Sequence, residues 1–112
     1  MIVPRIHNRA KPGHIELDLS ANEQTSAGKM LYQLYYKSSS DELMSLAPEI
    51  SGFPHNGGVH TMRVIGPYED VFAWFALLRE RYEKISQLED WFNEIQRQIG
   101  VYLRYGRLNV EA

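Results

Sequence analysis

The chain has 112 residues, a formal net charge of −2 and no cysteine. Its hydrophobic content of 44% and charged content of 23% exclude an intrinsically disordered chain and indicate a single globular domain over residues 1–112. The lack of cysteine excludes disulfides and thiolate-bound metal, and the near-neutral charge argues against nucleic acid as a partner.

No segment approaches the roughly 18 consecutive apolar residues that a membrane helix needs. The first ten residues also lack the apolar run of a signal peptide. We therefore expect a soluble cytoplasmic protein without a membrane partner.

Two strands are predicted near the start of the chain. Residues 2–6 can form a short strand, which Pro4 would confine to the edge of a sheet. Residues 11–13 predict a turn, and residues 14–20 then alternate between apolar and polar side chains. This period of two predicts a half-buried strand with Ile15, Leu17 and Leu19 on one face and His14, Glu16, Asp18 and Ser20 on the other.

Residues 29–37 allow two interpretations. Met30, Leu31, Leu34 and Tyr35 fit a helical spacing, but three tyrosines within five residues favour a strand. We expect a strand here, paired with residues 14–20 as a hairpin.

The middle of the chain predicts a short helix followed by a strand. Ser39 and Glu42 have the spacing of a capping box, which opens a short helix that ends before Pro48. Residues 51–58 are rich in turn formers and predict a loop, and residues 59–65 are apolar and β-branched enough for a strand.

The C-terminal third, residues 68–105, is almost continuously helical in pattern. One apolar stripe, with spacings of three and four, slips by one position at Ser86 and then resumes. Acidic residues follow both expected starts, which favours two helices over one long helix. We interpret Ser86 as the N-cap of the second helix, with Glu89 completing a capping box. The stripe comprises Val71, Phe75, Leu78, Tyr82 and Ile85, followed by Leu88, Phe92, Ile95, Ile99 and Tyr102.

These elements together predict the fold class. We expect an α+β fold with a small, mostly antiparallel sheet of three or four strands. Two C-terminal helices should pack on one face of this sheet, and one short helix should lie between strands.

Some apolar residues of the helical region do not belong to the stripe. Phe72, Leu77 and Val101 point in other directions, so one buried face cannot accommodate them. Either the helices pack on two sides within the domain, or these residues form a partner surface, most simply in a twofold homodimer. With Trp74 and Trp91, they form the candidate partner-binding set.

Polar and aromatic residues offer a second candidate set. His55, His60, Tyr32 and Tyr36 are candidate ligand-binding residues for a pocket between sheet and helices. The histidine spacing matches no zinc signature, and no nucleotide, protease or hydrolase motif occurs. We therefore expect no metal, no cofactor and no catalytic residue.

Glu16 and Asp18 share a strand face with His14 and are the most concentrated polar group in the chain. A solvated strand face is the simplest explanation.

The leading functional hypothesis is a non-enzymatic protein–protein interaction module. It would be a small cytosolic adaptor, inhibitor or immunity-type binder, homodimeric and able to bind another protein. The first alternative is a small ligand-binding domain or enzyme that uses His60 and the tyrosines. The second is a weak nucleic-acid binder that uses the N-terminal strands.

Overall fold

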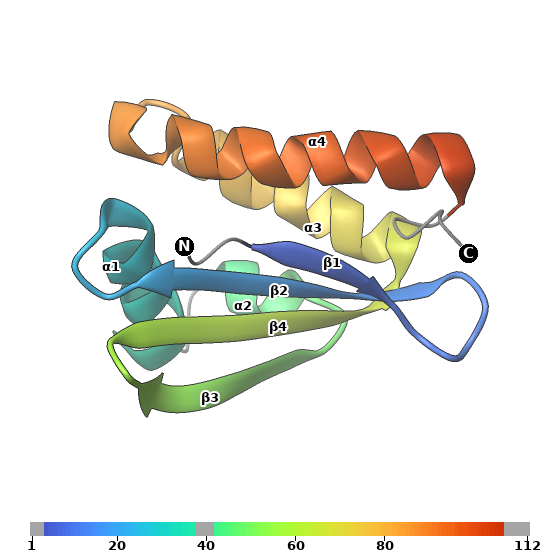
Figure 1. Cartoon of the computed structure of the whole chain (residues 1–112). Coiled ribbons are helices and arrows are strands. Elements are labelled where there is room, and N and C mark those ends of the chain that lie inside the picture. Colours follow the sequence, from blue (N-terminus) through green and yellow to red (C-terminus); the bar gives the residue numbers. More distant parts are fainter. Residues whose placement is uncertain (1–3, 38–41, 107–112) are drawn as a thin grey trace.

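A computed structural model describes residues 4–37 and 42–106 and shows an α+β fold (Figure 1). The four strands form one antiparallel sheet in the order β1-β2-β4-β3. They are β1 (Arg5–Asn8), β2 (His14–Asn22), β3 (Ile50–Asn56) and β4 (Val59–Pro67). The helices are α1 (Ser26–Tyr32), α2 (Glu42–Leu46), α3 (Tyr68–Arg81) and α4 (Glu89–Tyr105). The predicted fold class is confirmed, including the short helix between strands.

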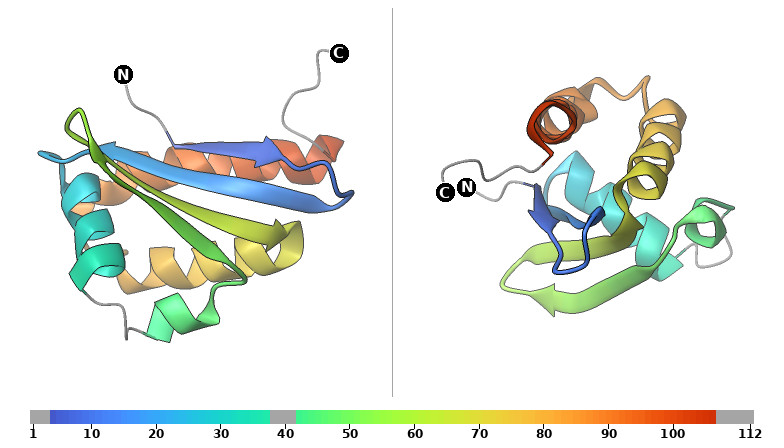
Figure 2. Two further views of the ribbon diagram at one scale, coloured as in Figure 1. Left: turned by 90° about the horizontal axis from the view of Figure 1, so that it is seen from below. Right: turned by 90° about the vertical axis from the view of Figure 1, so that its right-hand side faces the viewer.

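The helices gather on one side of the sheet, as both views of Figure 2 show. Strict alternation along β2 and β4 directs one set of side chains toward them, and these side chains are fully buried. They are Ile15, Leu17, Leu19, Met62 and Val64. The described part of the chain places no helix over the opposite face, which carries most of the polar members of both strands.

Helix α4 also protects the edge of the sheet. The backbone N–H of Ile6 in β1 donates a hydrogen bond to Gln98 Oε1 at 2.9 Å. Gln98 Nε2 donates to the Pro4 carbonyl at 2.8 Å. Since β1 is an edge strand, these two bonds occupy backbone groups that would otherwise invite another strand. The predicted edge strand is confirmed for Arg5 and Ile6, within a strand that covers residues 5–8, while residues 2 and 3 lie outside the described residues.

The strand predicted for residues 29–37 is wrong. The chain forms α1 and then a π-helical turn, Gln33–Lys37. Helical spacing buries Met30, Leu31 and Leu34 together in the core, and this burial outweighs the strand preference of the tyrosines. Consequently β2 pairs with β1 and β4, and the predicted hairpin does not form.

The loop predicted for residues 51–58 is also wrong for most of its length. Residues 50–56 form β3, and only Gly57 and Gly58 make the turn into β4. Pro54 is compatible with this strand because β3 is an edge and its pairing with β4 is irregular between Phe53 and Asn56. The strand predicted at residues 59–65 is confirmed as part of β4.

The break between two C-terminal helices is confirmed, but the proposed cap is wrong. Helix α3 ends at Arg81, and a 3₁₀ turn, Ser86–Leu88, leads into α4. Leu88 occupies the N-cap position of α4 without a side-chain cap, and Ser86 is not the cap. Glu89 instead opens the first turn as an acidic residue near the positive end of the helix dipole. The predicted Ser39 cap of α2 lies outside the described residues.

Most of the predicted stripe is buried in the core. Val71, Phe75 and Leu78 of α3 contact the core, as do Leu88, Phe92, Ile95, Ile99 and Tyr102. Tyr82 is only partly buried, and Ile85 is exposed because the chain has already left helix α3 at that point.

Candidate functional site

The apolar residues outside the stripe take up different positions in the fold. Phe72 is partly buried between the two long helices. Its ring makes edge contacts with Tyr68 and with Tyr102 of α4, at centroid distances of 5.8 and 5.6 Å. Phe72 therefore belongs to the contact between helices α3 and α4, and its direction is explained within the chain.

The two tryptophans of the candidate set point inward. Trp74 is 2% exposed, and its indole N–H donates to the Leu43 carbonyl at 2.7 Å. Trp91 is partly buried against the core, and its indole N–H donates to the Ser20 carbonyl at 3.2 Å. Trp74 thus fastens α2 to α3, and Trp91 fastens α4 to the end of β2.

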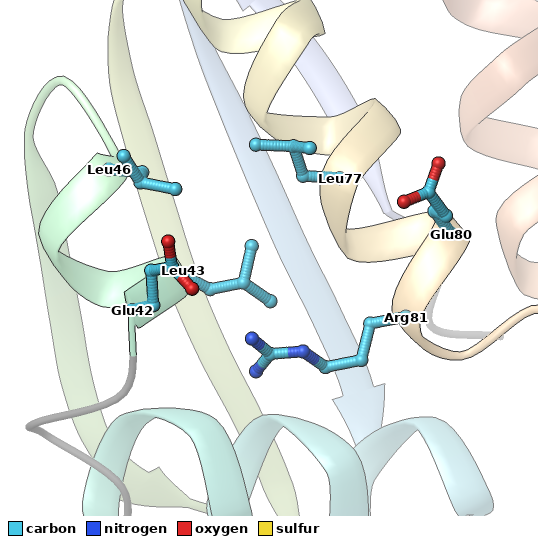
Figure 3. Close-up of a pocket in the computed structure, with 6 residues that line it drawn as sticks. All are labelled: Glu42, Leu43, Leu46, Leu77, Glu80 and Arg81. Atoms are coloured by element: carbon cyan, nitrogen blue, oxygen red, sulfur yellow. The ribbon is translucent and has the colours of Figure 1, made fainter.

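Leu77 is different, since its side chain is 42% exposed. It lies opposite Leu46 of α2, which is 53% exposed, and Figure 3 shows the two side chains directed toward one another. Between them is a hollow of about 310 Å³, and we call this surface the leucine groove. Its lining residues are Glu42, Leu43, Leu46, Leu77, Glu80 and Arg81.

The leucine groove exists because Trp74 fixes α2 beside α3. Leu43 is buried and forms the base of α2, while Leu46 lies one turn later and stays at the surface. Leu77 lies three residues after Trp74, so it faces the same neighbouring helix farther along α3. The sequence identified Leu77 through its position outside the stripe, but it carried no signal for the docking of α2. Val101, the remaining member of the set, is partly buried on α4.

The structure also brings together two predicted ligand-binding residues. The rings of Tyr32 and His60 lie 5.4 Å apart with an interplanar angle of 48°. They line a second hollow, of about 430 Å³, with Glu23, Gln24, Lys29 and Gln33. The side chains of His55 and Tyr36 lie outside the described residues.

The open face of the sheet carries a network of ion pairs around Glu16 and Asp18. His7 Nε2 lies 3.1 Å from Asp18 Oδ2, and Arg9 Nη1 lies 2.9 Å from Glu16 Oε1. Arg63 Nε lies 3.3 Å from Glu16 Oε2 and 3.1 Å from Asp18 Oδ1. The two carboxylates are therefore shared among basic side chains from β1, from the turn after it and from β4.

This network shifts the two carboxyl groups in opposite directions. Burial, the hydrogen bond with Glu16 and the charge of Glu16 raise the pKa of Asp18 to about 6, against the opposing charges of Arg63 and His7. Burial would also raise the pKa of Glu16, but the hydrogen bond with Asp18, the charge of Arg63 and the hydrogen bond with Arg9 outweigh it and lower that pKa. One carboxyl group of the pair is thus much the weaker acid.

The sequence placed this pair on one strand face with His14, and the alternating burial along β2 agrees with that. The register sets His7 opposite Glu16 and Arg63 opposite Asp18, so the basic partners come from neighbouring strands. Single ligand atoms of His7, Glu16 and Asp18 lie within 4.8 Å of one another, a spacing that a metal ion can use. The Arg63 guanidinium already lies against both carboxylates, so a metal ion at this place would compete with it.

No known protein family, no curated protein and no solved structure matches this chain. Within residues 4–37 and 42–106, none of the helices has both the length and the apolar character of a membrane span.

Proposed function

We propose that the protein is a non-enzymatic protein–protein interaction module that acts in the cytoplasm as a homodimer. The leucine groove is its docking surface, and a second copy of the chain occupies it. The observation that supports this most is the exposed pair Leu46 and Leu77, which face one another from two helices held in place by Trp74.

Exposure of paired leucines has a free-energy cost in water that docking removes. Full burial of one leucine side chain is favourable by about 1.5–3 kcal/mol relative to exposure. Leu46 and Leu77 each retain about half of their surface for a partner. Two copies joined by a twofold axis would bury four such side chains, because the same patch is used twice.

The charges around the groove favour a second copy over a strongly basic or acidic partner. Glu42 and Glu80 line it together with Arg81, so both signs are present. In a twofold arrangement, Arg81 of one copy can approach a carboxylate of the other. A guanidinium group has five N–H donors and can serve contacts within and between chains.

The size of the groove indicates a weak dimer. Stable complexes usually bury about 800 Å² on each partner, and two short stretches of helix supply less than that. We therefore expect self-association at micromolar or higher concentration, in rapid exchange.

A dilution series of amide NMR spectra tests this proposal. The expected result is a set of concentration-dependent shifts at residues 42–46 and 77–81. Residues 103–105, at the exposed end of α4, serve as an internal control because Leu103 is 61% exposed without lying in the groove. Spectra that do not change with concentration, or shifts confined to α4, would exclude the groove as the dimer surface.

A further inference from the structure

The hollow that Tyr32 and His60 share is lined by residues from three segments of the chain. Glu23 and Gln24 belong to the link between β2 and α1. Lys29, Tyr32 and Gln33 follow at helical spacings of three and four, so they share one face. His60, in β4, supplies the base of the hollow.

The link between β2 and α1 is held rigidly. Thr25 caps α1 by accepting a hydrogen bond from the Gly28 N–H at 3.1 Å, and it donates to the Asn22 carbonyl at 2.7 Å. A Cβ atom on Gly28 would lie only 2.0 Å from that carbonyl oxygen, so only glycine fits there. The backbone N–H of Glu23 donates to the Gly58 carbonyl at 2.7 Å, which ties the link to the turn before β4. The hollow is therefore formed before any ligand arrives.

The lining residues combine four kinds of recognition chemistry. Tyr32 is 40% exposed and offers an aromatic surface, while His60 is 7% exposed and its ring lies in tilted contact with the Tyr32 ring. Lys29 supplies a positive charge at the exposed side. Glu23 supplies a carboxylate, and Gln24 and Gln33 supply amide donors and acceptors. A matching ligand carries a flat ring, an edge of hydrogen-bonding groups and a negative charge.

We infer that this hollow binds a nucleoside monophosphate, with the base stacked on Tyr32 and the phosphate paired with Lys29. Bases stack on tyrosine without regard to sequence, and glutamine amides pair with base edges. The volume of about 430 Å³ falls in the range of small-molecule sites. The stacking contact does not select one base, because every base has an aromatic face.

The test is an NMR titration of the full chain with GMP, with AMP, guanosine and inorganic phosphate as separate arms. GMP should shift the amides of residues 23–33 and 58–60 with a dissociation constant on the order of 0.1–1 mM, as expected for one stacked ring and one charge pair. AMP should bind about as well as GMP, because stacking does not distinguish the bases. Guanosine should bind several-fold more weakly, and inorganic phosphate should leave these amides unchanged.

Variants identify the contributing side chains. Tyr32→Ala should weaken GMP binding about tenfold by removing the stacking surface. Lys29→Gln should reduce GMP binding to the level of guanosine, because the phosphate then has no cation. Tyr105→Ala, a change in a tyrosine that is 56% exposed at the end of α4, is the matched control and should leave binding unchanged.

Several results would overturn this inference. They are an absence of shifts at millimolar GMP, equal binding of inorganic phosphate, or unchanged affinity in Tyr32→Ala with its spectrum otherwise intact. If Tyr32→Ala fails to fold, the GMP affinity of Lys29→Gln tests the inference instead, because the Lys29 side chain is exposed and its replacement should not disturb folding. The titration does not depend on the dimer, because Leu77→Glu should bind GMP as the wild type does.

Discussion

Helices α3 and α4 both lie over the sheet, but their apolar residues are arranged differently. Helix α4 buries one stripe, and its outer side is mostly polar, with Leu103 alone as a large exposed aliphatic residue. Helix α3 carries apolar residues around more of its circumference. Val71 faces the core, Phe72 contacts α4, Trp74 contacts α2, and Leu77 remains at the surface beside α2.

The difference shows that an apolar residue outside a stripe has no single meaning. Phe72 and Trp74 bury their apolar surface within the chain, because α3 has neighbours on three sides. Leu77 does not, and its neighbour Leu46 is exposed as well. Only the residues that remain exposed after packing can indicate a partner.

The largest expected effect concerns Trp74. Trp74→Ala should lower the free energy of unfolding by about 3–5 kcal/mol, since it removes a buried ring and leaves the Leu43 carbonyl without its donor. Trp91→Ala is the matched control and should cost less, because Trp91 is only partly buried. Denaturant unfolding measures both. Equal losses would mean that α2 is not held through Trp74.

A smaller effect is expected at Phe72. Phe72→Ala should lower the free energy of unfolding by about 2 kcal/mol, because a partly buried ring loses its contacts with Tyr68 and Tyr102. The solution mass should not change, because Phe72 lies between helices of one chain. If Phe72→Ala folds with wild-type stability but fails to self-associate, Phe72 belongs to the partner surface and not to the contact between α3 and α4.

The polar face of the sheet should make stability depend on pH. Asp18 has a raised folded-state pKa, so between its ordinary value of 3.8 and about 6 the folded chain keeps a proton that the unfolded chain has lost. Its contribution therefore favours folding at low pH and is lost as the pH rises through about 6. Glu16 has a lowered pKa and acts in the opposite sense, losing its contribution as the pH falls below its ordinary value of 4.5.

Asp18→Asn isolates this contribution. As the pH is raised from 5 to 7, the melting temperature of the wild type should fall by about 4 °C relative to that of Asp18→Asn. This shift corresponds to a loss of about 1 kcal/mol in the free energy of unfolding after solvent screening. Thermal melts monitored by circular dichroism at several pH values check this. A constant difference between the two proteins across that range would show that Asp18 does not titrate there.

Much of the fold was predictable because its main periodicities are local. Alternation in residues 14–20, the β-branched and apolar content of residues 59–65, and the stripe of residues 68–105 all reflect burial against a single layer. Residues 29–37 and 51–58 were predicted wrongly because local preferences competed with tertiary packing. The tyrosines favoured a strand where Leu31 and Leu34 needed a helix, and Pro54 suggested a loop where an edge strand can accept proline.

The candidate sites were predictable only in part. Leu77 and the pair Tyr32 and His60 stood out in the sequence, although nothing local placed Tyr32 beside His60. Leu46 did not stand out, because the groove depends on how α2 docks against α3. Arg63 became a partner of Asp18 only through the pairing of β2 with β4.

The most direct test of the proposed docking surface is sedimentation equilibrium of the wild type, Leu77→Glu and Leu103→Glu over a range of concentrations. The wild type and Leu103→Glu should both approach twice the chain mass of 13.0 kDa at high concentration. Leu77→Glu should stay monomeric, because a glutamate at this position loses apolar contact and would place a charge in the interface. A wild type that stays monomeric throughout, or a Leu77→Glu variant that dimerises as the wild type does, would contradict the account.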